Sequence, residues 1–326
     1  MELYEYKKRN TPPYLIKKSP SIGAFSKEGC VLAIGLFDGV HLGHRALIER
    51  AKKEADKKGM PLGIFTFRGE EGYKSDPEIL LSTENKCEVF ERLGADFTVI
   101  ADFDAVCDLE ARDFVNDVLI GEIGARICVV GYNFRFAKNA TATADTLSLL
   151  MKEEDRRVIT VDEFRQNGKE VSSSCIKMLI RSGKVTDAAV LLGAPYSVSG
   201  RVEHGRGFGK VLGFPTVNTA MGSGGVIPKK GVYHTKISVG DKLYTAITNI
   251  GSCPTFGERE LHLESFILDF ERYIYDENIK IYFVEYIREE IRFNSAEELK
   301  MQINVDINTI KTHGDISWQQ IGQSLQ

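Results

Sequence analysis

The sequence predicts an α/β domain with a parallel sheet, followed by an antiparallel β-barrel that a terminal helix closes. Over residues 31–165, short apolar runs alternate with helical stretches, which is typical of a parallel sheet covered on both faces. Over residues 196–292 the chain is rich in strand-like segments separated by glycines, which is typical of an antiparallel barrel. The pattern changes near Leu192–Pro195, so we expect domains over residues 1–192 and 193–326.

Each strand expected in the α/β part is a short apolar run. These runs are Val31–Phe37, Pro61–Phe67, Asp96–Asp102, Arg126–Asn133 and Arg157–Asp162. The helical stretches between them are His44–Lys58, Thr83–Leu93, Leu109–Ile123 and Asp145–Glu154. Because ligands of such sheets bind outside the carboxyl ends of the strands, the segments that follow the strands are candidate site walls.

Two further helical pieces, Ser173–Arg181 and Val185–Leu192, complete the first domain. In the second domain, the hairpin signal Gly240-Asp241 joins the expected strands Val232–Val239 and Lys242–Ile250. The further expected strands are Leu261–Phe270 and Ile279–Ile291. The terminal helix is expected from Ser295 to about Lys311, because Glu298 stands three residues after Ser295 in a capping box.

Composition excludes several classes of protein. A net charge of −4 over 326 residues argues against a nucleic-acid partner, since binding to a phosphate backbone needs a basic face. The six cysteines show no C-x-x-C spacing and predict reduced thiols of a cytoplasmic protein. The N-terminus lacks the apolar region of a signal peptide, and no apolar run is long enough to span a bilayer, so we expect no membrane partner. The oligomeric state stays open.

The segment Gly35–His44 carries the strongest chemical signal. It follows an apolar strand and opens a helix, so its backbone N–H groups and the positive helix end can face a phosphate. His41 and His44 flank Gly43, and none of the three supplies a nucleophile for a covalent intermediate. The arrangement suits stabilisation of charge on a phosphate under attack, which is nucleotidyl-transfer chemistry. The candidate phosphate-binding residues of this turn are Gly35, Phe37, Asp38, Gly39 and Gly43.

Some residues of this turn could have structural roles instead of a role in phosphate binding. A histidine in a turn is often a surface residue, although the pair in a strand–turn–helix context is far more specific. Phe37 and Val40 could belong to the core, and Asp38 could brace the turn or cap the helix. Two other strand ends, Thr66–Arg68 and Gly131–Phe136, are candidate walls of the same site.

A second glycine-rich segment, His204–Lys210, lies in the barrel part. Its glycines permit close approach to phosphates, which Arg206 or Lys210 can neutralise. Thr216 and Asn218 follow; at i, i+2 on a strand, their neutral oxygens point the same way and could hold Mg²⁺ together with ATP phosphates. The alternative is a glycine hairpin followed by a buried strand. The candidate phosphate-binding residues here are Gly205, Gly207, Gly209, Lys210, Gly213 and Pro215.

Phosphoryl transfer to an alcohol also needs a carboxylate near the acceptor hydroxyl. Glu264 is the best candidate, because a charge in an apolar strand is costly unless it has a partner or a function. Alternation places it on the face opposite Leu263, Ser265 and Ile267, although that polar face could simply be solvated.

These motifs resemble one family. Over essentially its whole length, the chain is similar to the bacterial bifunctional riboflavin kinase/FMN adenylyltransferases, often called bacterial FAD synthetases. Gly35–His44 fits the family's Gly-x-Phe-Asp-Gly-x-His-x-Gly-His turn at every fixed position, and Gly213–Asn218 fits Gly-Phe-Pro-Thr-Ala-Asn with one exchange. The segments Ser172–Lys177 and Gly131–Ala137 match two further motifs.

The resemblance implies a Rossmann-like nucleotidyltransferase domain and a six-stranded riboflavin kinase barrel. It implies that Glu264 is the general base, that Thr216 and Asn218 bind Mg²⁺ with ATP, and that Arg288 lies near the flavin. The other residues it implies are Ser172, Ser173, Ser174 and Lys177 for ATP and Asn133, Phe134 and Arg135 for the flavin. The expected substrates and products are ATP, riboflavin, FMN and FAD.

The chain departs from the family pattern mainly in its first half. The family continues after Thr66-Phe67 with Glu-Pro-His-Pro, where this chain has Arg68–Glu71. Lys177 replaces an arginine, which loses a two-pronged phosphate contact, and Ala137 replaces a glycine. In the barrel, Asp276 replaces a glycine after Tyr275.

We therefore expect an enzyme that phosphorylates riboflavin and then adenylylates FMN. One alternative is a riboflavin kinase whose adenylyltransferase module is weak or inactive. The other is a non-catalytic flavin or nucleotide sensor, against which the intact His41, His44, Thr216, Asn218 and Glu264 argue.

Overall fold

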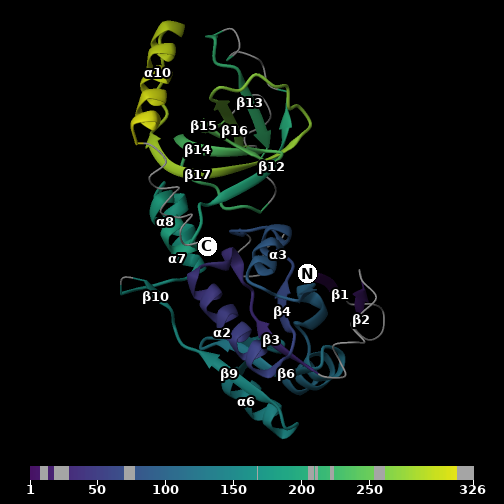
Figure 1. Cartoon of the computed structure of the whole chain (residues 1–326). Coiled ribbons are helices and arrows are strands. Elements are labelled where there is room, and N and C mark those ends of the chain that lie inside the picture. Colours follow the sequence, from purple (N-terminus) through teal and green to yellow (C-terminus); the bar gives the residue numbers. More distant parts are fainter. Residues whose placement is uncertain are drawn as a thin grey trace. The chain divides into compact units, whose positions relative to one another are not determined.

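The chain forms two compact units, Met1–Ser172 and Ser173–Gln326 (Figure 1). The computed structural model describes residues 1–7, 14–17, 29–69, 78–166, 168–204, 209, 212–220, 224–252 and 261–313. The helices α7 (Ser173–Arg181) and α8 (Val185–Leu192) pack with the second unit, although the sequence pattern joins them to the first. The boundary between the two enzyme modules at residues 192/193 stays a prediction.

The first unit is built on a seven-stranded sheet in the order β2-β1-β5-β4-β3-β6-β9. Its strands are β1 (Glu2–Lys7), β2 (Tyr14–Lys17), β3 (Cys30–Ile34), β4 (Leu62–Phe67), β5 (Phe97–Ala101), β6 (Ala125–Gly131) and β9 (Arg157–Val161). All neighbours pair in parallel except β1 and β2, which form an antiparallel hairpin at one edge. The five predicted strands are confirmed, and the hairpin was not predicted. The first of them ends at Ile34 instead of Phe37, because the chain turns into the left-handed region at Phe37.

Helices cover both faces of this sheet, as predicted. Alternate residues of β3 and β6 point to opposite faces and belong to separate apolar clusters. The clusters show that α2 and α3 cover one face, and that η2 and α6 cover the other. The helices are α2 (Leu42–Lys58), α3 (Thr83–Arg92), α4 (Phe103–Val106), α5 (Ala111–Asp113), η2 (Phe114–Glu122) and α6 (Ala144–Glu153). The helix expected over residues 109–123 is thus a short α-helix that continues as the π-helix η2.

Short elements connect the larger ones in the first unit. They are η1 (Asp38–Val40), β7 (Arg135–Phe136), η3 (Lys138–Ala140), β8 (Ala142–Thr143), β10 (Arg165–Gln166) and β11 (Lys169–Glu170). β7 pairs with β8, and β10 pairs with β11, each as an antiparallel hairpin.

The second unit is a closed antiparallel barrel of six described strands, in the order β12-β13-β16-β15-β14-β17. The strands are β12 (Ser197–Glu203), β13 (Thr216–Ala220), β14 (Gly231–Val239), β15 (Lys242–Ser252), β16 (Leu261–Ile267) and β17 (Asn278–Arg288). Inside it, the hydroxyl of Thr248 lies 2.7 Å from that of Thr235 and 2.8 Å from that of Ser265. The six-stranded barrel that the family resemblance implied is therefore confirmed.

The terminal helix α10 (Ala296–His313) lies along the barrel (Figure 1). Its Ile310 packs against Val232 and Ile247 on the outside of the strands. The predicted cap is half correct: Ser295 Oγ accepts the N–H of Glu298 at 3.1 Å, but the Glu298 carboxylate accepts the N–H of Asn294 at 2.9 Å. The helix thus begins where the sequence predicts, with one contact shifted by a residue.

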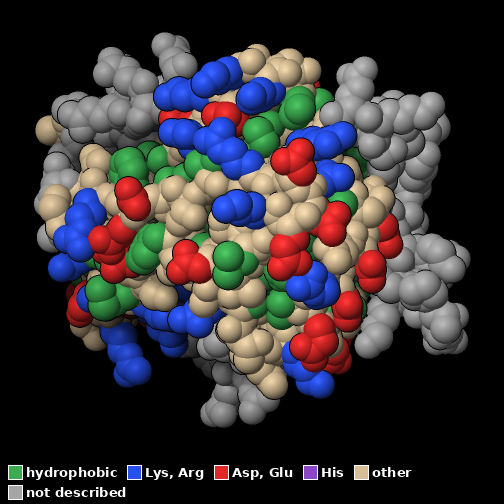
Figure 2. All heavy atoms as spheres, turned by 90° about the horizontal axis from the view of Figure 1, so that it is seen from below, with side chains coloured by type: hydrophobic (Ala, Val, Ile, Leu, Met, Phe, Trp, Pro, Cys, Tyr) green, Lys and Arg blue, Asp and Glu red, His purple; other side chains and the backbone are tan. Residues whose placement is uncertain are grey.

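Charges of both signs share the surface. On the face drawn in Figure 2, Lys and Arg side chains gather near the upper edge, and both signs are interspersed over the rest. This mixture is in keeping with the net charge of −4. The five described cysteines are free thiols, and Cys253 lies outside the described residues.

Candidate functional site

The turn between β3 and α2 has an unusual backbone. Phe37, Gly39 and Val40 have φ values of +50°, +80° and +41°, and the two non-glycine residues among them are strained in this region. Phe37 is buried, and its ring packs edge-on against His44 with 5.4 Å between centroids. The structure therefore gives Phe37 and Val40 the core positions that the sequence left open, and the turn is held by packing.

Two imidazoles are stacked at the start of α2. His41 is the N-cap residue, and its Nδ1 accepts the N–H of His44 at 3.4 Å. The rings lie 3.6 Å apart between centroids at an angle of 17°. A Cβ at Gly43 would lie 3.3 Å from the His41 ring and from Phe164 Cβ, so glycine allows this close packing. Because Nδ1 is an acceptor, the neutral His41 ring carries its proton on Nε2.

Both imidazoles are neutral at pH 7. Burial lowers the pKa of His41 to about 4. Burial also lowers the pKa of His44 well below its usual value, and the charges of His41 and Lys86 lower it further. The buried Nδ1 of His44 has no hydrogen-bond partner among the described residues. The pair can therefore donate hydrogen bonds to a phosphate without carrying charge of its own.

Residues from three neighbouring segments brace this turn. The Asp38 carboxylate accepts the N–H of Leu80 at 2.7 Å, so it braces the turn and does not cap α2. Lys86 on α3 is fully buried, and its Nζ donates to Phe67 O at 2.8 Å and to Leu36 O at 3.4 Å. The Thr66 hydroxyl donates to the same Leu36 carbonyl at 3.0 Å. Sequence reasoning missed Lys86, whose signal was a charge on the apolar side of a predicted helix.

The other expected walls of this site lie at strand ends. Arg68 Nε donates to Asp102 Oδ1 at 3.0 Å, at the ends of β4 and β5. Asn133 and Arg135 are exposed after β6. Phe134 stacks on Phe136 with 5.5 Å between centroids. Their placement at the carboxyl end of the sheet agrees with the prediction, while their role toward a flavin stays a prediction.

The turn after β7 places non-glycine residues at positive φ. Ala137, Asn139 and Ala140 have φ values of +64°, +56° and +54°. Ala137 combines φ +64° with ψ 178°, a conformation that is almost restricted to glycine. This is the position at which the family resemblance places a glycine, so the exchange introduces strain.

The serine motif spans the boundary of the two units. Ser172 ends the first unit, and Ser173 and Ser174 begin α7 in the second. Lys177 is buried on the same helix. The expected role of these four residues in nucleotide binding stays a prediction.

A cavity of about 350 Å³ opens on the outside of the barrel beside α10. Its walls are apolar side chains with a few polar groups among them. The lining residues are Gly209, Leu212, Phe214, Thr216, Val232, Ile247, Asn249, Glu264, Phe266, Arg288, Glu290, Ile291, Phe293, Leu299, Ile303 and Asp306. An apolar cavity with few polar groups is typical of a small-molecule site.

Glu264 stands in this cavity between two strands that carry polar side chains. On β16 it pairs with Asn218 of β13 on one side and with Asn249 of β15 on the other. The hydroxyl of Thr216 donates to Glu264 Oε1 at 2.7 Å. The neighbouring Ser265 is fully buried on the opposite face, as alternation predicts. The structure therefore brings Thr216, Asn218 and Glu264 together.

The glycine-rich segment before β13 is described only in part. Gly205, Gly207 and Lys210 lie outside the described residues. A Cβ at Gly209 would lie 2.3 Å from Phe214 O, so only glycine fits where the segment folds back. Gly213 has φ +86°, and Pro215 directly precedes β13. Their expected contacts with phosphate stay predictions.

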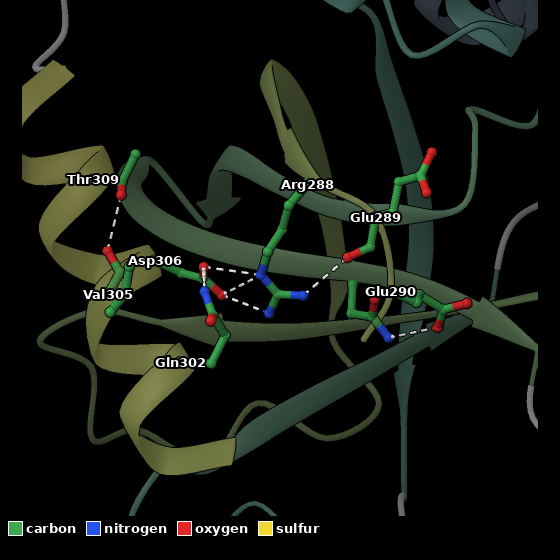
Figure 3. A network of polar contacts seen from close by, with 8 residues as sticks. Arg288, Glu289, Glu290, Gln302, Val305, Asp306 and Thr309 are labelled. Atoms are coloured by element: carbon green, nitrogen blue, oxygen red, sulfur yellow. Dashed lines mark hydrogen bonds and ion pairs between the residues drawn. The ribbon is translucent and has the colours of Figure 1, made fainter. Parts of the chain in front are cut away.

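Arg288 reaches the cavity from the end of β17 and is held by α10 (Figure 3). It forms an ion pair with Asp306, with 2.7 Å between Nη2 and Oδ2. Across the same cavity, Asn249 Nδ2 donates to Glu290 Oε1 at 3.4 Å. Sequence reasoning did not assign Glu290 or Asp306 to the site. For Asp306 the missed signal was a carboxylate among the isoleucines of the predicted terminal helix.

Comparison with known proteins also finds two parts in the chain. The family model described as FAD synthetase matches residues 24–175, and the one described as riboflavin kinase matches residues 192–313. The bifunctional riboflavin kinase/FMN adenylyltransferase of Bacillus subtilis is 33% identical over 90% of this chain and 93% of its own length. The protein of the same name from Escherichia coli K12 is 32% identical over 90% and 95%.

A solved structure covers a similar share of the chain. The crystal structure titled macrolide-efflux protein from Streptococcus pneumoniae has a TM-score of 0.79 and 29% identity, over 87% of this chain and 94% of that one. None of the described helices of this chain combines the length and apolar character needed to cross a membrane. Two family models in order and two relatives above 30% identity agree, so this chain belongs to the family of bifunctional riboflavin kinase/FMN adenylyltransferases.

Proposed function

We propose that the barrel unit phosphorylates riboflavin to FMN with ATP and that the α/β unit adenylylates FMN to FAD. Membership of the family supports both reactions. The observation that carries the first reaction is the contact of Thr216 with Glu264 inside the apolar cavity. It provides a carboxylate of fixed orientation beside neutral oxygen ligands, which is the set that phosphoryl transfer to an alcohol needs.

In the kinase step, Glu264 accepts the proton of the terminal ribityl hydroxyl. The hydroxyl oxygen attacks the γ-phosphorus of ATP, the bond from that phosphorus to the bridging oxygen breaks, and ADP leaves. The Thr216 hydrogen bond occupies Oε1 and fixes the carboxylate, which leaves Oε2 to take the proton. The main contribution of the protein is therefore orientation and proton acceptance.

Thr216 and Asn218 suit the Mg²⁺ that accompanies ATP. Both offer neutral oxygens, and no group of three His, Cys, Asp or Glu in the described parts of the chain could hold a metal by itself. Mg²⁺ favours few protein ligands and many phosphate or water oxygens, so this donor set fits it. When bound, the ion would neutralise phosphate charge.

In the adenylyl step, a phosphate oxygen of FMN attacks the α-phosphorus of ATP, and pyrophosphate leaves. His41 and His44 lie at the N-terminal end of α2, where backbone N–H groups favour an anion. Because both rings are neutral, they stabilise the developing charge as hydrogen-bond donors in a largely buried site.

A second candidate function is a riboflavin kinase with a slow or inactive adenylyltransferase. The observation that favours it is the strained backbone of Ala137, next to the segment expected to bind the flavin. Lys177 in place of arginine points in the same direction, because lysine lacks the two-pronged phosphate contact.

A time course separates these functions. Purified protein is incubated with riboflavin, ATP and Mg²⁺, and FMN and FAD are separated by chromatography. A parallel reaction starts from FMN. Rapid formation of FMN followed by FAD supports the bifunctional enzyme. Formation of FMN from riboflavin, with no FAD in either reaction, supports the second candidate. No product in either reaction would contradict both and support the sensor. We also expect this protein to be located in the cytoplasm.

A further inference from the structure

The guanidinium group of Arg288 is held in place by contacts with the terminal helix. Its Nε donates to Asp306 Oδ1 at 3.0 Å and to Oδ2 at 3.1 Å, and its Nη2 donates to Oδ2 at 2.7 Å. Its Nη1 donates to the carbonyl of Glu289 at 3.0 Å. Asp306 itself is fixed, because Gln302 Nε2 donates to its Oδ1 at 2.9 Å (Figure 3). The guanidinium plane is therefore set from both α10 and the end of β17.

This pair is expensive to bury, so stability alone does not explain it. The Arg288 and Asp306 side chains are 18% and 3% exposed. They lie beside the apolar contact of Val232 and Ile247 with Ile310. Desolvation of two such charges offsets most of their attraction, and apolar residues of similar size often stabilise a fold as well or better. What the pair does provide is a fixed orientation for a planar donor.

The charge of the cavity indicates what this donor can bind. Among the residues that the structure describes, the charged ones that line it are Glu264, Glu290, Asp306 and Arg288, so carboxylates predominate there. Asp306 already neutralises Arg288, which leaves little net attraction for a phosphate. Each terminal nitrogen of Arg288 keeps one N–H without an acceptor among the described residues. These N–H groups suit a neutral carbonyl oxygen.

The apolar lining indicates what carries that oxygen. Phe214, Phe266 and Phe293 line the cavity together with Ile291 and Ile303. Aromatic and branched side chains of this kind pack well against a flat ring system. A planar ring with carbonyl groups at its edge satisfies both the apolar walls and the donors of Arg288.

We propose that Asp306 is a positioning residue that orients Arg288 toward a carbonyl of the flavin ring and away from the phosphates of ATP. The proposal rests on the proposed riboflavin kinase function of the barrel. It predicts that Asp306 sets the affinity for the flavin and leaves the affinity for ATP unchanged. A purely structural role would affect both substrates alike.

The test uses the full chain with Asp306→Asn, which keeps the shape and the acceptor oxygen for Gln302. Without the carboxylate, Arg288 is free to turn toward Glu290, which lines the same cavity. Riboflavin binding, followed by the quenching of its fluorescence with and without AMP-PNP, should weaken by about 10- to 100-fold, the range for hydrogen bonds to a charged donor. KM for riboflavin should rise in parallel, while kcat and KM for ATP change by less than about threefold. Glu297→Gln, an exposed carboxylate of the same helix, is the matched control and should change none of these values.

A double variant guards against loss of folding. Arg288→Met with Asp306→Leu removes both charges together, so this variant should fold as stably as the wild type. It should nevertheless bind riboflavin more weakly than the wild type, because it lacks the guanidinium donor. Tight riboflavin binding by this folded double variant would overturn the proposal. So would equal increases of KM for riboflavin and ATP in Asp306→Asn. A wild type that binds riboflavin but forms no FMN would contradict the kinase function alone, because the binding measurements still decide the role of Asp306.

Discussion

The two sites of this chain are built in opposite ways. The site in the α/β unit comes mainly from one continuous segment, Gly35–His44, whose histidines stack within the same turn. The cavity on the barrel combines residues from Gly209 to Asp306, which five strands and a helix bring together. A motif contiguous in sequence therefore marks the first candidate site directly. Local signals reveal Thr216, Asn218 and Glu264 of the second, whereas its Glu290 and Asp306 become visible only in the folded chain.

The sites also differ in what keeps them in shape. Positive φ values at Phe37 and Val40 show that the turn stores backbone strain, which packing against α3 holds in place. Hydrogen bonds support both sites, as between Lys86 and the Leu36 carbonyl in the turn and between Thr216 and Glu264 in the barrel. Substitutions should therefore act locally in each unit, and four predictions test this separation.

The largest effect is expected for Glu264→Gln. The amide keeps its contact with Thr216 but cannot accept the substrate proton, so kcat for FMN formation should fall by about 10²- to 10⁴-fold. Riboflavin binding and FAD formation from supplied FMN should stay at wild-type values. Rates of FMN formation within a few-fold of wild type would remove Glu264 from the role of base.

The counterpart in the α/β unit is His44→Ala. Loss of one hydrogen-bond donor to the developing charge should lower the rate of FAD formation by about 10²- to 10³-fold. FMN formation should be unaffected, because the barrel has its own core. His204→Ala, which removes a ring stacked on Tyr275 in the barrel, serves as the control for loss of an imidazole. If His44→Ala slowed both reactions equally, the two sites would not be independent.

Acid should destabilise the α/β unit through His41. Its pKa is about 4 in the fold and 6.5 as a free side chain. Between these values the unfolded chain binds a proton that the folded unit does not, so the free energy of unfolding falls as the pH falls. From pH 7 to pH 5, His41 alone should account for about 2 kcal/mol, and His44 acts in the same direction.

Calorimetry of the full chain at several pH values measures this slope. His41→Asn removes the titrating group and keeps a good N-cap, so the transition of the α/β unit should depend less on pH than in wild type. His204→Asn in the barrel should leave that dependence unchanged. An equally steep dependence in His41→Asn would assign it to other groups.

The smallest effect is expected for two substitutions that introduce glycine, one in each unit. Ala137→Gly should stabilise the α/β unit by about 1 kcal/mol, because alanine at φ +64° and ψ 178° is strained. Asp276→Gly in the barrel should gain less, although Asp276 has φ +65°, because aspartate tolerates that region and pairs with Arg201 at 3.0 Å. Urea unfolding checks both. Ala46→Gly within α2 should destabilise by about 1 kcal/mol, which shows that any gain depends on φ.

Much of the fold followed from local patterns. The helices Ser173–Arg181 and Val185–Leu192 begin and end at the predicted residues, and the predicted hairpin at Gly240-Asp241 joins two strands of the barrel. The N-terminal strand Glu2–Lys7 was missed because it has no apolar run and owes its conformation to pairing with β5. Its strand character depends on its two neighbours in the sheet, β2 and β5, and not on the segment alone.

The site residues that sequence reasoning missed share one physical cause. Lys86 and Asp306 are charged side chains on helix positions where a core residue would be expected. Their partners lie far away in sequence, at the Phe67 carbonyl and at Arg288. No local pattern links such partners, whereas Thr216, Asn218 and Glu264 were found because spacing and the cost of a charge in a strand are local signals.

The place of Asp306 in the C-terminal helix α10 has a consequence for synthesis of the chain. All strands of the α/β sheet precede residue 162, so that unit can fold while the barrel is still being made. The cavity on the barrel lacks a wall until Asp306 has been added, 134 residues after Ser172. At about 5–20 residues per second, this delay is roughly 7–27 s. A nascent chain should therefore become able to bind nucleotide at its histidine turn well before it can bind flavin at the barrel.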